Sequence, residues 1–180
     1  MDNIKNIIVG GAITLIIGGT AYSFTQQDVV NNLSTETGMT QEQATQYIND
    51  IPEEDLASWD VIGNDFIVES NKTRSQATEI DCENYEYDWE SPTLTCASGK
   101  LQLQKIADAE QATGEAYIKI SLDTAVKEDV QALINMLDEL NAVYNLEVMK
   151  NVYTKAELDE LITGNSYNKA ILKAALESEQ

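Results

Sequence analysis

The chain has 180 residues, enough for one domain with its own core, and 43% of them are hydrophobic, too many for a disordered polymer. It carries 31 acidic residues against 11 Lys and Arg. The resulting net charge of -20 disfavours nucleic acids and anionic lipid surfaces as partners. Histidine is absent, which excludes imidazole metal ligands and nucleophiles that a histidine activates.

The most apolar part of the sequence runs from Ile7 to Phe24 and contains no charged side chain. As a helix it would extend about 27 Å, slightly less than a hydrocarbon core of about 30 Å. Lys5 precedes the segment and no Lys or Arg follows before Lys72, which favours a cytoplasmic N-terminus. We therefore expect residues 1-24 to form a membrane anchor or a signal segment. A cleaved signal peptide and a buried helix remain as alternatives to the anchor, because small residues at Ala21 and nearby fit a processing site.

Small residues recur along this segment at the spacing of one helix face. Gly10, Thr14 and Gly18 are four residues apart, a pattern that lets a second transmembrane helix approach closely. These three residues are the predicted contact surface within a bilayer, and they favour an anchor that is retained.

Three helices are predicted next. A polar helix over residues 24-37 ends at Gly38, and a second begins at Thr40, which has capping-box spacing with Gln43, and ends at Pro52. A third begins with Pro52 in its first turn and continues to about residue 74. Its predicted buried side consists of Leu56, Trp59, Ile62, Phe66 and Ser70.

The segment "EIDCENYEYDWESPTLTCASGKLQLQKI", residues 79-106, is typical of antiparallel strands because it is rich in Tyr, Trp and Thr and is interrupted by Ser-Pro and Ser-Gly. The alternation in "AYIKISL", residues 116-122, predicts a third strand. A turn at residues 90-92 would place Cys82 and Cys96 on neighbouring strands, within bonding range. We expect a disulfide between them, which would close a loop of about 15 residues and stabilise the fold by about 3 kcal/mol.

Helices resume near Thr124. A regular apolar stripe predicts one helix to Tyr144; its members are Val126, Val130, Leu133, Ile134, Leu137, Leu140 and Tyr144. Thr154 and Glu157 form a capping box for a helix that ends at Gly164, and a last helix begins near Ser166. Residues 25-180 therefore predict one acidic α+β domain, with helices flanking a small three-stranded antiparallel sheet.

Without histidine, catalysis would have to use carboxylates, Lys or Tyr. Asp81, Glu83, Glu86, Asp88 and Glu90 offer oxygen ligands for calcium, but they lack the spacing and the turn glycine of an EF-hand loop. No motif indicates catalytic, cofactor-binding or metal-binding residues, so we expect a protein that is not an enzyme and needs no cofactor.

Three stretches, "NIIVGGAITLIIGGTAYSFTQQDVVNN", "ETGMTQEQATQYINDIPEEDL" and "NSYNKAILKAALES", together resemble a family of conserved cyanobacterial proteins with one N-terminal apolar segment. The resemblance implies a thylakoid or plasma membrane location, with the domain in the lumen or periplasm. It implies no activity and no functional residues.

These observations predict a single-pass membrane protein that contacts the bilayer through residues 7-24. Its domain would bind a protein partner outside the cytoplasm, in the assembly or maintenance of a membrane complex. The alternative is a cleaved periplasmic or luminal protein that binds a cation or a small ligand.

Overall fold

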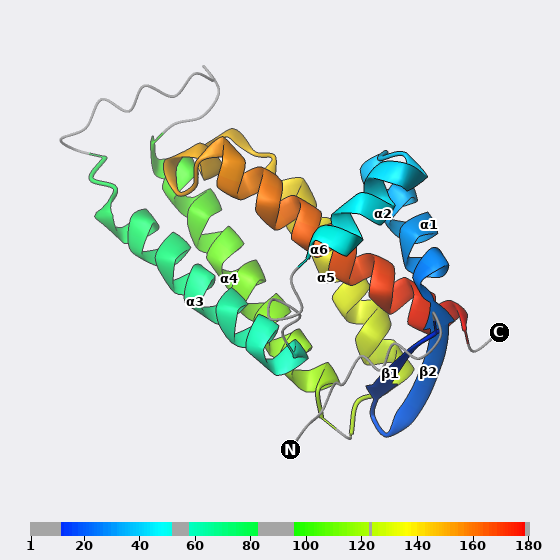
Figure 1. Cartoon of the computed structure of the whole chain (residues 1–180). Coiled ribbons are helices and arrows are strands. Elements are labelled where there is room, and N and C mark those ends of the chain that lie inside the picture. Colours follow the sequence, from blue (N-terminus) through cyan, green and yellow to red (C-terminus); the bar gives the residue numbers. More distant parts are fainter. Residues whose placement is uncertain (1–11, 52–57, 83–95, 123, 179–180) are drawn as a thin grey trace.

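The computed structural model describes residues 12-51, 58-82, 96-122 and 124-178 (Figure 1). A hairpin of β1 (Ala12–Ile17) and β2 (Thr20–Thr25) precedes a series of helices. These are α1 (Gln26–Thr37), α2 (Gln41–Asp50), α3 (Trp59–Glu79), α4 (Cys96–Ile120), α5 (Lys127–Tyr144), the short 3-10 helix η2 (Glu147–Asn151) and α6 (Lys155–Glu177).

The helices pack in a chain of neighbours. α3 packs on α4, α4 on α5, α5 on α6, α6 on α1, and α1 on α2, while β2 also lies against α6. The last helix of the sequence therefore lies between α5 and α1, and the first described elements pack against it (Figure 1).

The expected N-terminal transmembrane or signal helix is wrong for residues 12-25, which form the antiparallel hairpin. Gly18 and Gly19, both with positive φ, make the two-residue turn that right-twisted strands favour. Leu15 and Ile17 are buried with Tyr22 and Phe24 in the core, so the apolar residues serve one face of a hairpin. Among the described helices, none has both the length and the apolar character that a bilayer span requires.

The expected α+β fold with a three-stranded sheet is also wrong, because the described residues are mostly helical and Cys96–Ile120 is a single helix, α4. Most of its buried positions are spaced alternately by four and three residues, as are those of α3, which is the heptad spacing of paired helices; Ala107 and Gly114 are buried beside this series. The buried series are Trp59, Gly63, Phe66, Ser70, Thr73, Ala77 and Ile80 on the α3 side, and Gly99, Leu103, Ile106, Glu110, Thr113, Tyr117 and Ile120 on α4. We call this interface the α3–α4 seam.

Two glycines set the close approach of the α3–α4 seam. A Cβ atom built on Gly63 would lie 2.5 Å from the carbonyl oxygen of Gly114, and one on Gly114 would lie 2.5 Å from that of Gly63. Nearby, the ring of Tyr117 stacks on Trp59 and Phe66, with centroid distances of 5.6 and 5.4 Å. The two backbones therefore meet with little room for a side chain at this point.

The predicted helix ends are right in part. Gly38 ends α1 with φ 73°, and the Thr40 capping box begins α2. The stop expected at Gly164 is wrong, because α6 continues through it to Glu177. Its second half buries Ala170, Leu172 and Ala175 completely, and this packing outweighs the cost of about 1 kcal/mol for an internal glycine.

Candidate functional site

A groove of about 320 Å³ lies between α3, the segment before α6, and the first half of α6. Its floor is partly apolar and is formed by Phe66, Tyr153 and Leu161. Gly164 lies in the same groove, and a Cβ atom added there would meet no described atom within 4 Å. This volume lies within the range of sites for small molecules. We call it the α3–α6 groove.

Four charged side chains line the α3–α6 groove. Glu69 and Lys72 come from α3, and Glu157 and Glu160 come from the first turns of α6. Three carboxylates against one ammonium leave two negative charges in a groove on a strongly acidic protein. The groove therefore attracts cations and repels anions.

Lys72 lies over an aromatic face. Its Nζ atom is 4.1 Å from the centre of the Tyr153 ring and 3.7 Å from Oε2 of Glu69. The Tyr153 hydroxyl donates a hydrogen bond of 2.7 Å to the same Glu69 oxygen. The ring and the carboxylate are thus held together, and an ammonium group already lies against both.

Glu157 caps the start of α6 and also lines the α3–α6 groove. The backbone N–H and the hydroxyl of Thr154 donate to its Oε2 atom, at 2.7 and 2.8 Å. These bonds hold the pKa of the Glu157 carboxyl below its usual range, and the positive charge of Lys72 acts in the same direction. Glu157 therefore remains ionised at the edge of the groove.

A buried carboxyl lies behind Tyr153, in the α3–α4 seam. The Tyr144 hydroxyl donates to Oε1 of Glu110 at 3.0 Å, and Oε2 has no hydrogen-bonding partner among the described residues. Burial raises the pKa of Glu110 to about 7. The Thr73 hydroxyl is 3.5 Å from that of Tyr153, and the Tyr144 and Tyr153 rings meet edge to face at 6.3 Å. These contacts place Glu110 behind the groove wall, outside the groove itself.

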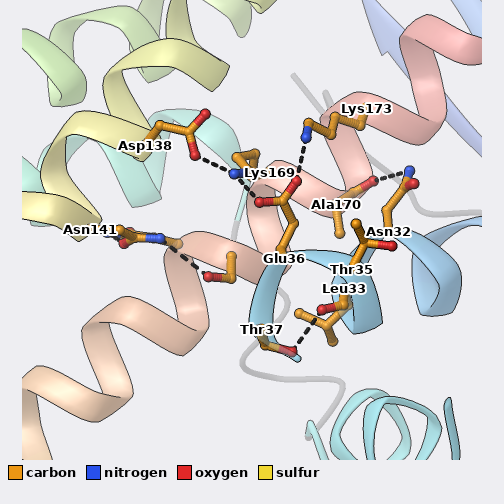
Figure 2. Close-up of polar contacts among 12 residues, drawn as sticks. Asn32, Leu33, Thr35, Glu36, Thr37, Asp138, Asn141, Lys169, Ala170 and Lys173 are labelled. Atoms are coloured by element: carbon orange, nitrogen blue, oxygen red, sulfur yellow. Dashed lines mark hydrogen bonds and ion pairs between the residues drawn. The ribbon is translucent and has the colours of Figure 1, made fainter. Parts of the chain in front are cut away.

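A second polar cluster joins α1, α5 and α6 (Figure 2). Lys169, only 4% exposed, points between Glu36 and Asp138, and Lys173 pairs with the other oxygen of Glu36. Burial opposes the charge on Lys169, but hydrogen bonds to Asp138 and Glu36 hold its pKa above the usual value. Asn32 donates from α1 to the Ala170 carbonyl at 3.4 Å. The charges here are satisfied internally, so the cluster fixes the packing of α1 on α6.

The predicted disulfide between Cys82 and Cys96 is confirmed, with 5.7 Å between the Cα atoms. It joins the chain just after α3 to the first residue of α4, in place of the neighbouring strands that the sequence suggested. The bond therefore closes one end of the α3–α4 hairpin.

Two of the three small residues of the predicted membrane stripe, Thr14 and Gly18, lie in the N-terminal hairpin and not on a helix. Thr14 is in β1, with its hydroxyl 3.4 Å from that of Ser23 in β2, and Gly10 is outside the described residues. Gly18 is in the hairpin turn, where a Cβ atom would lie 1.7 Å from the Ala125 carbonyl oxygen. The turn and the close contact with the chain before α5 thus explain why position 18 is a glycine.

Of the acidic run considered for calcium, the part from Glu83 to Glu90 lies outside the described residues. In the described ranges no group of three or more Cys, Asp or Glu side chains is arranged to hold a metal ion.

The groove residues were missed by sequence reasoning, because its two walls are separated by about 80 residues of sequence. One signal was present: the Thr154 capping box fixed where α6 begins and thus placed Glu157. Comparisons with protein-family models, with curated proteins and with solved structures find no match.

Proposed function

We propose that this protein binds a small organic cation in the α3–α6 groove and is not an enzyme. The observation that carries the proposal is the combination of an apolar, aromatic floor with three carboxylates around it. A cation with a hydrocarbon part matches both features, since the hydrocarbon is removed from water and the charge meets Glu69, Glu157 and Glu160.

The size of the groove supports a small ligand. A volume of about 320 Å³ is at the lower end of the range for small-molecule sites. Anionic ligands are disfavoured by the two excess negative charges of the lining and by the net charge of -20.

The lining supports binding over catalysis. Glu157 is bonded to the start of α6 and stays ionised, so it is a poor general acid at neutral pH. Glu110, whose pKa is closer to neutrality, is fully buried in the α3–α4 seam and does not line the groove.

We place this function outside the cytoplasm, in a periplasm or thylakoid lumen. The Cys82–Cys96 disulfide supports an oxidising compartment. The sequence suggested either an anchored assembly protein or a periplasmic or luminal protein that binds a cation or a small ligand. The proposed function corresponds to the second. The hairpin of residues 12-25 belongs to the folded domain, so it disfavours both an anchor helix and cleavage within this segment, and we propose ligand binding by the domain with the hairpin in place.

The test is a titration of the isotope-labelled protein with hexyltrimethylammonium, followed by NMR. We expect saturable shifts of the amide signals of Leu161, Gly164 and Asn165, which line the groove. Hexanoate, which has the same chain length and the opposite charge, should leave these signals unchanged, and n-hexanol should bind more weakly.

Gly164 offers a matched pair of variants. Gly164→Leu fills the groove from a position where an added Cβ meets no described atom, and it should abolish the saturable shifts. Gly164→Ala adds one methyl group and should retain most of the binding. If hexyltrimethylammonium produces weak shifts all over the acidic surface, and Gly164→Leu does not change them, the proposed function is wrong.

A further inference from the structure

The cation nearest the aromatic floor of the groove belongs to the protein itself. The ammonium of Lys72 lies against the Tyr153 ring and within 3.7 Å of Glu69. Across the groove, the charge of Lys72 also acts on Glu157. An aromatic face with carboxylates beside it is the arrangement by which proteins hold organic ammonium groups.

We infer that Tyr153, Glu69 and Glu157 form the cation subsite of the groove, that Lys72 occupies it in the free protein, and that an alkylammonium ligand displaces Lys72. This inference rests on the proposed function and specifies it further. The head group of the ligand takes the place of the lysine ammonium, and its alkyl chain lies along Phe66 and Leu161.

Lys72 is held weakly enough to be displaced. Its side chain is 42% exposed, and its pairing with Glu69 is a surface contact within one turn of α3. Such ion pairs contribute little, and the contact of this partly exposed ammonium with the buried Tyr153 ring contributes only modestly more. The lysine chain is long and flexible, so its ammonium can move into water while its stem remains on α3.

Tyr153, in contrast, is fixed. Its hydroxyl is bonded to Glu69, and its ring contacts the buried Tyr144 edge to face. The subsite therefore keeps its shape when Lys72 leaves, and the ligand does not have to reorganise the aromatic wall.

The deciding variant is Lys72→Gln. Removal of the internal competitor should tighten the binding of hexyltrimethylammonium about tenfold, while the affinity for neutral n-hexanol should stay unchanged. Lys155→Gln is the matched control, because Lys155 is 85% exposed, pairs with Asp159 on its own helix, and carries the same charge. Its removal should change the affinity by less than about twofold. Lys72→Arg, which keeps a cation in the subsite, should show no gain.

The outcomes separate the two proposals. If Lys72→Gln binds no more tightly than the wild type, or gains only as much as Lys155→Gln, while the shifts remain in the groove, the inference about Lys72 is wrong and the proposed function stands. If none of the variants shows saturable shifts in the groove, the proposed function is wrong and the inference fails with it.

Discussion

Glu110 should make the protein less stable as the pH rises towards neutrality. Its carboxyl is fully buried, one oxygen has no partner among the described residues, and burial raises its pKa from 4.5 to about 7. Around it lie the Tyr144 hydroxyl from α5, Thr73, Glu69 and Lys72 from α3, and Tyr153 from the segment before α6. Between these two pKa values the folded protein holds a proton that the unfolded chain has released, so the free energy of unfolding falls with rising pH.

The size of the effect follows from the two pKa values. Each pKa unit corresponds to about 1.4 kcal/mol, so the passage from 4.5 to about 7 removes about 3 kcal/mol of stability. This loss is complete above the folded pKa and absent below the unfolded one. A neutral amide at the same position cannot ionise, so Glu110→Gln should avoid it.

The assay is urea unfolding of the oxidised protein at intervals from about pH 5 to about pH 8, for the wild type and for Glu110→Gln. The stability of the variant relative to the wild type should rise by about 3 kcal/mol across this range. Glu139→Gln removes the same charge at an exposed position of α5 and corrects for the general effect of lowering the net charge. If the Glu110→Gln and wild-type curves run parallel, the Glu110 carboxyl ionises normally and the description of its surroundings is wrong.

Four further variants test the packing. Gly114→Ala, which puts a methyl group 2.5 Å from the Gly63 carbonyl oxygen, should lower the free energy of unfolding by about 1–3 kcal/mol. Gly164→Ala should instead raise it by up to about 1 kcal/mol, and equal effects would contradict the close approach in the α3–α4 seam. Replacing both cysteines, Cys82→Ser with Cys96→Ser, should cost about 3 kcal/mol in urea unfolding, and an unchanged midpoint would contradict a structural role for the bond. Lys169→Met removes the buried partner of Glu36, which keeps only its pair with Lys173, and should cost about 1–3 kcal/mol at neutral pH. The cost should shrink in acid, where Glu36 becomes protonated; a thermal melt that does not change at either pH would refute it.

The sequence predicted those helices whose ends carry a capping signal or whose buried face is wholly apolar. Thr40 and Thr154 begin α2 and α6 as capping boxes, and the stripe from Val130 to Tyr144 marks α5, although its expected first member, Val126, is the N-cap and is 52% exposed. The α3–α4 seam was not predicted, because Gly99, Glu110 and Thr113 occupy buried positions of α4. The apolar residues of α4 alone therefore do not show the helical period. Leu101 and Leu103, separated by one polar residue, gave the alternation of a strand, although Leu101 is 52% exposed on α4.

The N-terminal segment was misread for a related reason. Apolar content is the same for a membrane helix and for a buried hairpin, and only the Gly18-Gly19 pair distinguishes them. A turn with two positive φ angles requires such residues, whereas a helix would need neither. The disulfide was predicted correctly from a wrong local structure, because closing a short loop depends on the distance between the ends and not on the elements that bring them together.

The groove could not be predicted from sequence because its position depends on the register of α3 against α4. That register is fixed by the contact of Gly63 with Gly114, and residues of this kind give no hydrophobic signal. Only when α3 is in place do Glu69 and Lys72 face the start of α6 across the groove.

Glu110 lowers the stability of the protein near neutral pH, yet it connects the α3–α4 seam to the groove. It accepts the hydrogen bond of Tyr144, and the Tyr144 ring supports Tyr153, which carries the proposed cation subsite. This predicts different effects for two substitutions. Glu110→Gln keeps an acceptor for the Tyr144 hydroxyl and should bind hexyltrimethylammonium as the wild type does. Glu110→Leu leaves that hydroxyl without its partner and should weaken binding severalfold, even if the protein stays folded. If NMR titration gives the two variants equal affinities, Glu110 does not position the aromatic wall, and its burial must be explained by the packing of α3 on α4 alone.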